Sequence, residues 1–351
     1  MFKKNIYLIL LVITITSCNY NTDTYSSKKE TTTVIPIAKN DALFAFGSCS
    51  NQAFEEQMWD EINFNKPEVW IWGGDAVYSD TEDPEYMKEQ YRIQKSNIGY
   101  QTLLKQTTVI GTWDDHDYGA NDAGKEYPMK NESKEIFLDF LDIPKNASIR
   151  NRDGVYNSYE YKYDKGSIKV ILLDARYFRT KLTPDTFGKK RYLDNVDSTG
   201  TMLGNKQWKW LENELNSSKA DFNVIVSGIQ VLSNLHGFEA WGNMPTERTK
   251  LLKLISTSKA KGVFILSGDR HICEISKIKL DNMPYPIYDI TSSGLTHSYT
   301  NVSKEENPYR ISDLVGLKNF TLLNFNFSKH SVDVEIRGKE NKLLISKNIK
   351  Y

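Results

Sequence analysis

The chain has 351 residues, and its 45 basic and 45 acidic side chains leave no formal net charge. This balance favours neither a nucleic acid nor an anionic membrane surface as a partner, and no specific nucleic-acid-binding motif is visible in the sequence. The mean hydropathy of −0.52, without a second apolar run of membrane length, argues against a membrane-embedded body.

The first 18 residues are predicted to be a lipoprotein signal peptide. Lys3 and Lys4 precede an almost unbroken apolar stretch, Ile6–Ile15, which is too short to span a bilayer comfortably. Ile15-Thr16-Ser17-Cys18 resembles a bacterial lipobox, which implies cleavage before Cys18 and lipid attachment to its sulfur. An ordinary signal peptide is the alternative. We therefore expect an exported bacterial lipoprotein in the cell envelope, periplasmic or on the outer surface, that meets the membrane through its lipid anchor only.

Residues 19–40 are rich in Ser, Thr, Lys and Asn, and this composition predicts a flexible tether. Residues 41–351 are long enough for one large α/β domain or two closely associated ones, and we expect a single domain. This part contains Cys49 and Cys273. In an exported protein two cysteines suggest a disulfide, but Cys49 also lies among candidate metal ligands, so both interpretations stay open.

The apolar pattern of the body predicts strands that alternate with helices and then an antiparallel meander. Pro84 follows Asp83, which is typical of a helix start, and this helix is expected to run towards Gln106. The class is therefore α/β with mixed sheets. Strands are predicted at 42–46, 69–72, 108–112, 167–174, 222–227 and 262–266, helices at 83–106, 131–141, 204–215 and 245–256, and meander strands at 320–327, 332–336 and 343–346.

Side chains that can hold metal ions are concentrated in four short segments. Each segment follows a predicted strand: Gly47-Ser48-Cys49, Gly74-Asp75-Ala76-Val77-Tyr78, Trp113-Asp114-Asp115-His116-Asp117 and Gly268-Asp269-Arg270-His271. Open α/β folds build their sites at such strand ends. Two metal ions roughly 3.5–4 Å apart, bridged by one carboxylate, provide the chemistry of phosphate-ester hydrolysis. Asp75 is the candidate bridge, with a turn aspartate as the alternative, and the four segments predict a metal-dependent hydrolase.

The order of these motifs resembles the PhoD-type alkaline phosphatases of the calcineurin-like metallophosphoesterase superfamily. Three further segments carry the resemblance: residues 173–179, 227–230 and 241–248. It implies a four-layer αββα sandwich of two mixed β-sheets flanked by helices. It also implies hydrolysis of phosphate monoesters or diesters by a metal-activated hydroxide. Many members carry an additional N-terminal domain and a C-terminal helix over the site; neither is expected here, which favours a more open site and bulkier diesters.

The resemblance also implies a dinuclear metal centre with an unusual thiolate and phenolate. Fe(III) is expected at one position and Ca²⁺ at the other, with other divalent metals possible. Asp115, rather than Asp114, matches the metal-binding asparagine of the superfamily. The implied Fe(III) ligands are Cys49, Asp75, Tyr78 and His271, and the implied Ca²⁺ ligands are Asp75, Asp115 and Asp269.

His116 matches the catalytic histidine of the superfamily, which protonates the leaving alkoxide or holds a phosphoryl oxygen. Arg176 and Arg179 are candidates for binding the substrate phosphate, and pairing with carboxylates such as Asp174 is an equal alternative. Asn121 and His236 are weaker candidates for the substrate site. His297 and His330 are expected to be structural or exposed.

The sequence therefore predicts a phosphoesterase that acts on a small-molecule, lipid or polymer phosphate ester. One alternative is a preference like that of a phospholipase D or a nucleotide phosphodiesterase, which the lipid anchor and an open site favour. The other is a surface lipoprotein that binds ligands without catalysis. All predicted metal ligands are present, which argues against the second alternative. The oligomeric state and the natural substrate do not follow from the sequence.

Overall fold

The computed structural model describes residues 32–37, 41–188, 190–196, 199–302 and 305–351. The predicted signal peptide, including Cys18, lies outside these residues. Within the described ranges, no helix combines the length and apolar character that a membrane crossing requires.

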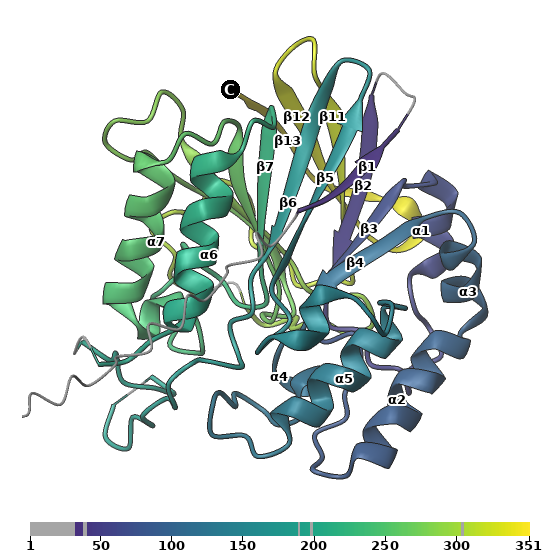
Figure 1. The fold of residues 1–351 in the computed structure, drawn as a ribbon, viewed down its shortest axis with the longest axis vertical. Coiled ribbons are helices and arrows are strands. Elements are labelled where there is room, and N and C mark those ends of the chain that lie inside the picture. Colours follow the sequence, from purple (N-terminus) through teal and green to yellow (C-terminus); the bar gives the residue numbers. More distant parts are fainter. Residues whose placement is uncertain (1–31, 38–40, 189, 197–198, 303–304) are drawn as a thin grey trace, which may run out of the picture. The chain divides into compact units, whose positions relative to one another are not determined.

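The strands of the described residues form two sheets that pack face to face (Figure 1). The first sheet contains, in spatial order, β1 (Thr33–Pro36), β5 (Asn157–Tyr163), β6 (Gly166–Leu172), β7 (Phe222–Ser227), β8 (Val263–Ser267), β10 (Ile287–Ser292) and β9 (Cys273–Ile278). The second contains β13 (Leu343–Lys350), β12 (Ser331–Arg337), β11 (Phe320–Asn326), β2 (Ala42–Gly47), β3 (Val69–Gly73) and β4 (Thr108–Thr112).

Helices cover the outer faces of both sheets, which completes the αββα sandwich predicted from the motif resemblance. Figure 1 shows α6 (Gly204–Ser217) and α7 (Pro245–Thr257) on the side of the first sheet. The helices packed on the second sheet are α1 (Trp59–Asn65), α2 (Pro84–Ser96), α3 (Ile98–Leu104), α4 (Asp115–Tyr118) and α5 (Lys130–Phe140). Three short 3₁₀ turns are η1 (Ser148–Asn151), η2 (Trp241–Asn243) and η3 (Lys339–Asn341).

The central strands are apolar on both faces because each face is covered. In β3, Val69 and Ile71 point into the core between the sheets, whereas Trp70 and Trp72 pack under the helices of the outer layer. This alternation follows from the two-residue period of a strand. It explains why the local sequence identified these strands: β4 and β7 have the predicted bounds, and β2, β3 and β8 differ by one residue at an end or at both ends.

The parallel strands of both sheets end at the same edge of the sandwich. β2, β3 and β4 are parallel neighbours in the second sheet, and β6, β7 and β8 are parallel neighbours in the first. The loops after β3 and β8 approach closely, since a Cβ atom added to Gly268 would lie 2.4 Å from the carbonyl oxygen of Gly73. The four predicted motifs therefore meet at one place although they are distant in sequence.

The long helix predicted from Asp83 towards Gln106 is wrong as a single element. It is interrupted at Asn97, whose backbone leaves the helical region and whose side chain accepts hydrogen bonds from Gly99 N (2.9 Å) and Tyr100 N (3.2 Å). Asn97 thus ends α2 and caps α3, because a short Asx side chain competes with the helical hydrogen bonds.

The predicted tether of residues 19–40 is wrong for Thr33–Pro36, which form β1. This strand pairs in parallel with β5, with Val34 opposite Glu160. Thr33, Val34 and Ile35 are β-branched, and such side chains favour a strand. The polar composition of residues 19–40 as a whole predicted a tether and did not reveal this short β-branched run.

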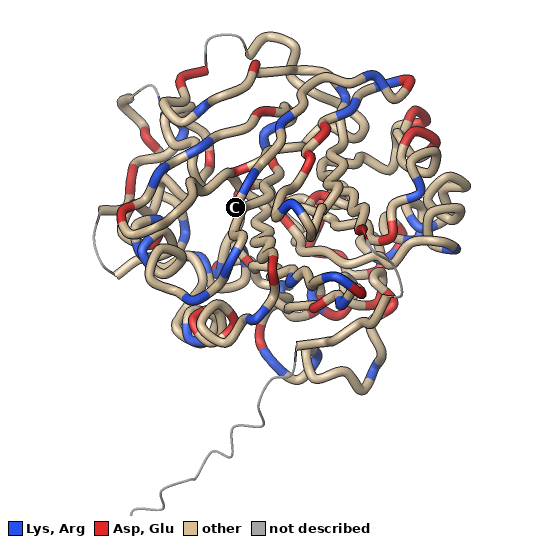
Figure 2. Tube along the Cα trace, turned by 90° about the horizontal axis from the view of Figure 1, so that it is seen from above, with Lys and Arg blue, Asp and Glu red and all other residues tan. Residues whose placement is uncertain are grey.

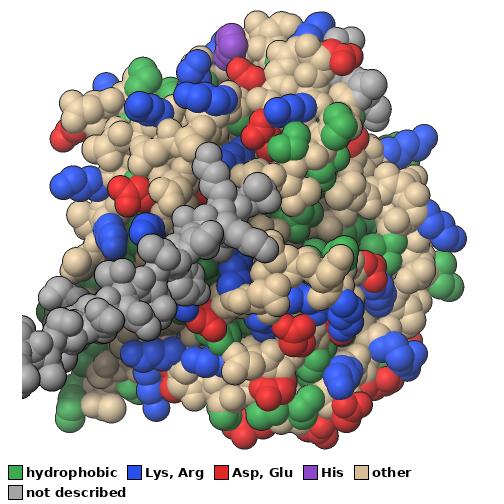
Figure 3. All heavy atoms as spheres, viewed as in Figure 1, with side chains coloured by type: hydrophobic (Ala, Val, Ile, Leu, Met, Phe, Trp, Pro, Cys, Tyr) green, Lys and Arg blue, Asp and Glu red, His purple; other side chains and the backbone are tan. Residues whose placement is uncertain are grey.

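Charges of both signs are mixed on the part of the surface that the figures show. Figure 2 shows acidic and basic residues distributed around the chain trace, and on the face drawn in Figure 3 they are interspersed with hydrophobic side chains. This distribution agrees with the balanced composition.

Candidate active site

Four of the predicted metal ligands share a strained backbone conformation. Cys49, Asp75, Asp269 and His271 have positive φ angles of 60°, 50°, 69° and 52°. Side chains other than glycine rarely adopt this region, and such residues cluster at functional sites. All four follow the ends of β2, β3 and β8, so the strain coincides with the position of the motifs. The local sequence does not predict these positive φ angles, since none of the four residues is glycine.

The thiol, one carboxylate and the phenol of the predicted iron site lie together. Cys49 Sγ donates to Asp75 Oδ2 at 3.4 Å, and the Tyr78 hydroxyl donates to the same oxygen at 3.4 Å. Cys49 and Asp75 are buried, and Cys49 and Cys273 are both free thiols. The structure therefore excludes the Cys49–Cys273 disulfide that the sequence left open. One Asp75 oxygen is shared by two groups that can each bind a metal when deprotonated.

In the described part of the chain, three groups of acidic residues and histidine could hold metal ions, and Asp115 belongs to each of them. Within a group, one ligand atom from every residue lies within 4.8 Å of the others. Asp75, Asp115 and His116 form the first group. Asp114, Asp115 and Asp269 form the second, and Asp115, Asp122 and Glu239 form the third. Asp115 thus lies centrally, next to both Asp75 and Asp269.

The electrostatics of the site fit a bound cation. Burial and the charge of Asp115 raise the pKa of Asp75 well above its ordinary value. Asp115 differs: although its burial opposes ionisation, Arg176 and His116 lower its pKa to about 2. Among the described residues, Asp115 Oδ1 and His271 Nδ1 are buried and accept no hydrogen bond. Buried acceptors without donors are rare, and metal ions would satisfy them and offset the repulsion between the carboxylates.

Asp114 and Asp115 are neighbours with different partners. Arg176 Nε donates to Asp114 Oδ1 at 2.7 Å, whereas its distance from Nη2 to Asp115 Oδ1 is 3.9 Å. The backbone packs closely here, since a Cβ added to Gly228 would lie 2.5 Å from Asp114 Oδ1. Each carboxylate has one oxygen bonded within the protein, since Asp115 Oδ2 accepts from Asp122 N at 2.8 Å. The other oxygen of each, Asp114 Oδ2 and Asp115 Oδ1, is buried and accepts no hydrogen bond. Asp115 belongs to all three groups and Asp114 to one, and the choice of Asp115 as the metal ligand stays a prediction.

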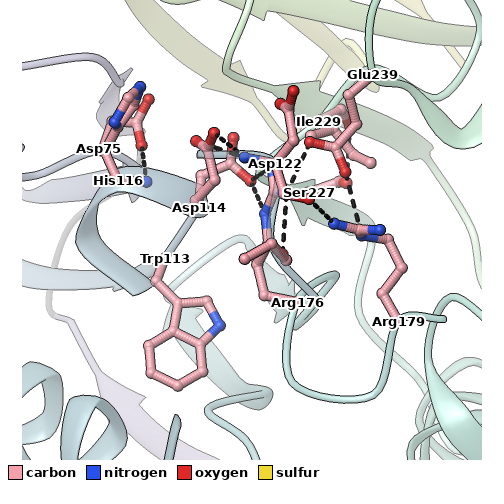
Figure 4. Close-up of polar contacts among 12 residues, drawn as sticks. Asp75, Trp113, Asp114, His116, Asp122, Arg176, Arg179, Ser227, Ile229 and Glu239 are labelled. Carbon is pink, nitrogen blue, oxygen red and sulfur yellow. Dashed lines mark hydrogen bonds and ion pairs between the residues drawn. The ribbon is translucent and has the colours of Figure 1, made fainter. Parts of the chain in front are cut away.

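Glu239 joins the two predicted phosphate-binding arginines (Figure 4). Its Oε2 lies 2.7 Å from Arg176 Nη1 and its Oε1 lies 3.1 Å from Arg179 Nε. Arg179 also donates to the carbonyl oxygens of Asp122 (2.5 Å) and Thr180 (3.1 Å). Both guanidinium groups are buried and bonded within the protein, which corresponds to the second of the two predicted roles. Glu239 was missed from sequence because it stands in an irregular loop without a recognisable motif.

Asp174 does not accept from either guanidinium group, contrary to the partner suggested from sequence. Its carboxylate instead accepts from Trp113 Nε1 (2.9 Å) and from the backbone N–H groups of Val155, Arg176 and Tyr177 at 2.9 Å each. Asp174 therefore shapes the turn that carries Arg176 and connects this turn to the loop after β4. The prediction failed because the chain turns after Asp174, so its side chain meets backbone groups before it meets a guanidinium.

His116 is held by a carboxylate that the sequence analysis did not identify. Its Nδ1 lies 2.7 Å from Asp80 Oδ2, and its ring stacks on Tyr78 with centroids 4.2 Å apart. Burial alone would lower the pKa of His116, but Asp80, Asp75 and Asp115 raise it to about 10. His116 is thus protonated at neutral pH in the absence of cations, with Nδ1 occupied by Asp80. The sequence did not predict a role for Asp80, because aspartates are common in loops.

The remaining predicted residues lie at different distances from this centre. The ring centroid of His271 is 6.4 Å from that of Tyr78 and 4.3 Å from that of His297, which places His297 at the site rather than in a structural position. His236 lies in the loop that leads to Glu239, and its ring stacks on Phe238. Asn121 is exposed. Nothing in these contacts tests the substrate-binding roles of Asn121 and His236, which stay predictions.

Comparison with known proteins agrees with the motif resemblance. A profile of the family described as PhoD-like phosphatase matches residues 44–321, which is most of the chain. The chain belongs to the PhoD-like phosphatase family. Among curated proteins, alkaline phosphatase D of Bacillus subtilis (strain 168) is 26% identical over 197 residues, covering 49% of this chain and 32% of the relative. The match thus spans about a third of that family member's length.

Solved structures support the fold of the family. The structure of PhoD matches with a TM-score of 0.71 at 16% identity, over 90% of this chain and 69% of that chain. GAP50, described as the anchor in the inner membrane complex of Plasmodium, matches with a TM-score of 0.57 at 13% identity, over 89% of each chain. At such low identity these matches establish the αββα architecture of this chain and carry no information about its substrate.

Proposed function

We propose that this chain is a metal-dependent phosphoesterase that hydrolyses phosphate monoesters, diesters or both. The observation that carries the proposal is the convergence of a thiol, a phenol, carboxylates and imidazoles from four strand ends. Membership of the PhoD-like phosphatase family supports the same reaction class. Asp75 is the proposed bridge because its Oδ2 contacts the thiol and the phenol of the iron site, and because it also forms a possible metal group with Asp115.

For the metals, the donor set supports Fe(III) at one position and Ca²⁺ at the other. Thiolate, phenolate and imidazole suit iron, and they would come from Cys49, Tyr78 and His271 together with Asp75. Asp75, Asp115 and Asp269 offer only oxygen atoms, which suit Ca²⁺. When bound, such ions neutralise the phosphoryl oxygens and lower the pKa of a coordinated water.

In this proposal His116 supplies the proton for the leaving oxygen. Asp80 accepts from Nδ1 at 2.7 Å, so the proton on Nε2 remains available for the substrate. The stack on Tyr78 fixes the plane of the ring. A positioned imidazole of this kind contributes by general acid catalysis. Arg176 acts through Asp114 and Glu239, which hold it in place beside Asp115.

The first test replaces Asp75 with Asn. Hydrolysis of a chromogenic phosphodiester by Asp75→Asn is expected to fall to background, while circular dichroism and thermal melting show an intact fold. Asp313→Asn, an exposed aspartate outside the site, is the matched control and keeps full activity. Turnover by Asp75→Asn at the wild-type rate overturns the proposal. Calorimetry that shows metal and phosphate binding by the wild type without turnover favours a binding lipoprotein instead.

The location of the protein is part of the proposal and rests on sequence alone. Residues 1–18 direct export, and Cys18 receives the lipid that holds the chain at the envelope membrane. Mass spectrometry of the mature N-terminus tests this step: a diacylglyceryl cysteine supports it, and an unmodified N-terminus contradicts it. An anchor of this kind places the site near membrane lipids and envelope polymers, which are candidate phosphate esters.

A further inference from the structure

Three aromatic side chains border the proposed metal site. We call Phe54, His297 and Tyr299 the aromatic strip. His297 is the member of the strip that contacts two predicted ligands, with its centroid 4.3 Å from that of His271 and 5.3 Å from that of Tyr78. Phe54 stacks on the outer side of His297 at 5.6 Å. Tyr299 contacts His271 edge to face at 4.8 Å.

The outer members of the strip are open to solvent. Phe54 is 48% exposed and Tyr299 is 49% exposed, whereas Cys49, Asp75 and His271 next to them are buried. An exposed aromatic side chain by itself needs no explanation, but these two flank the same buried ligand group. The strip is therefore the part of the wall that a substrate meets when its phosphoryl group reaches the carboxylates.

The strip is fixed to the ligand loops by hydrogen bonds of its backbone segment. Tyr299 N donates to the carbonyl of His271 at 2.9 Å, and Thr296 N donates to the carbonyl of Cys49 at 3.3 Å. Thr296 Oγ1 lies 2.9 Å from His297 Nδ1 and accepts from Asn51 N at 2.9 Å. The rings thus have a defined position relative to the site, as a binding surface requires.

The predicted general acid and the strip both contact Tyr78. His116 stacks on one side of Tyr78, and His297 meets Tyr78 edge to face. Because His116 and His297 contact the same ring, the organic group of a leaving oxygen protonated by His116 would lie near the strip. We propose that the aromatic strip binds the leaving group of the substrate and that this group is aromatic or similarly flat and apolar. The inference rests on the proposed function and deepens it.

The binding of two phosphonates tests the inference. Aryl and alkyl esters differ in chemical reactivity, and a comparison of binding affinities avoids this difference. Calorimetry on the metal-loaded protein is expected to show phenylphosphonate bound roughly three- to tenfold more tightly than methylphosphonate, the range expected for one aromatic contact. In Phe54→Ala with Tyr299→Ala this preference is expected to fall below about twofold. The affinity for methylphosphonate is expected to stay unchanged.

Phe64→Ala is the matched control, because Phe64 is 74% exposed on α1 and does not belong to the strip. It is expected to leave both affinities as in the wild type, and each single variant of the strip is expected to show a partial effect. Thermal melting checks that all variants are folded.

Several outcomes overturn the inference. Equal affinity of the wild type for the two phosphonates does so, as does an equal loss of both affinities in the double variant, since the strip then only supports the metal ligands. If the wild type hydrolyses the chromogenic diester but shows no phenyl preference, the inference fails and the proposed function stands. If the wild type neither binds a phosphonate nor hydrolyses the diester, both fail.

Discussion

Arg176 and Asp114 form a completely buried ion pair, in which Nε and Oδ1 are 2.7 Å apart. The same guanidinium reaches Glu239 at 2.7 Å, so one cation balances two buried carboxylates. This pairing distinguishes two adjacent aspartates of identical chemistry. Asp114 Oδ1 is bound by Arg176, whereas Asp115 Oδ1 lies 3.9 Å from the same guanidinium.

The first prediction concerns the stability that depends on this pair. Arg176→Met removes the cation that pairs with Asp114 and leaves Glu239 with Arg179 alone, so the free energy of unfolding is expected to fall by about 3–5 kcal/mol. Urea denaturation measures the change. Arg92→Met is the matched control: Arg92 pairs with Glu89 on the surface, and exposed pairs of this kind contribute about 0–1 kcal/mol.

If Arg176→Met does not fold, Arg176→Lys serves as the second variant. Lysine keeps the charge but lacks the planar group that reaches Asp114 and Glu239 together, so a smaller loss of stability is expected. Wild-type stability in both variants would contradict a structural role for the pair.

The second prediction concerns the predicted phenolate ligand. Wild-type protein is expected to contain iron and calcium by elemental analysis and to show a visible phenolate charge-transfer band. Tyr78→Phe should lose this band, because it removes only the hydroxyl that contacts Asp75 Oδ2. Cys49→Ser should retain a phenolate band. Tyr86→Phe, on the exposed face of α2, is expected to be indistinguishable from the wild type.

Zinc without colour in the wild type would refute the assignment of iron. An unchanged spectrum of Tyr78→Phe would show that the phenol is not a ligand, even if iron is present.

The third prediction tests His116 as the proton donor. His116→Asn is expected to lower kcat for an alkyl phosphate ester by roughly 10²–10⁴. The loss should be much smaller for a p-nitrophenyl ester, since nitrophenolate leaves without protonation. Asp80→Asn removes the carboxylate at His116 Nδ1. It should also lower kcat more for the alkyl ester than for the p-nitrophenyl ester, but by a smaller factor.

His330→Asn is the control for this substitution, because His330 lies in the turn before β12 with φ of 47°, where asparagine is well tolerated. It should leave both activities unchanged. An equal loss of kcat on the two esters would assign His116 to phosphoryl binding instead of proton donation.

The fourth prediction concerns the pH dependence of stability. Burial, with the nearby charges of Arg270 and Arg310, lowers the pKa of His236 to about 3. An unfolded histidine titrates near pH 6.5, so below about pH 6.5 the unfolded chain binds a proton that the folded chain does not. This group therefore removes stability as the pH falls from about 6.5 towards 3, and contributes no pH dependence above this window.

His236→Gln removes the titration. Relative to the wild type, the variant is expected to gain about 1 kcal/mol between pH 8 and pH 5, with allowance for the partial exposure of the side chain. Denaturant unfolding at the two pH values measures the difference. A constant difference between variant and wild type would show that His236 titrates normally in the folded state.

The sequence alone determined the parts of the structure that depend on local patterns. Buried strands such as β4 and β7 consist of short apolar runs with clear limits, and their bounds were predicted correctly. Because parallel strands end at a common edge, the motifs after β2, β3, β4 and β8 could be placed together before any contact was known. The family resemblance then predicted the αββα arrangement of helices and sheets and the class of reaction.

Only the tertiary structure decided which polar groups face one another. Glu239 lies in a loop without pattern, and its place between Arg176 and Arg179 depends on how that loop folds over the first sheet. The position of His297 beside His271 likewise joins segments from different strands. Asp114 and Asp115 differ by one residue and not at all in chemistry. What separates them is the direction of each side chain at the start of α4, which packing against Gly228 and Arg176 determines.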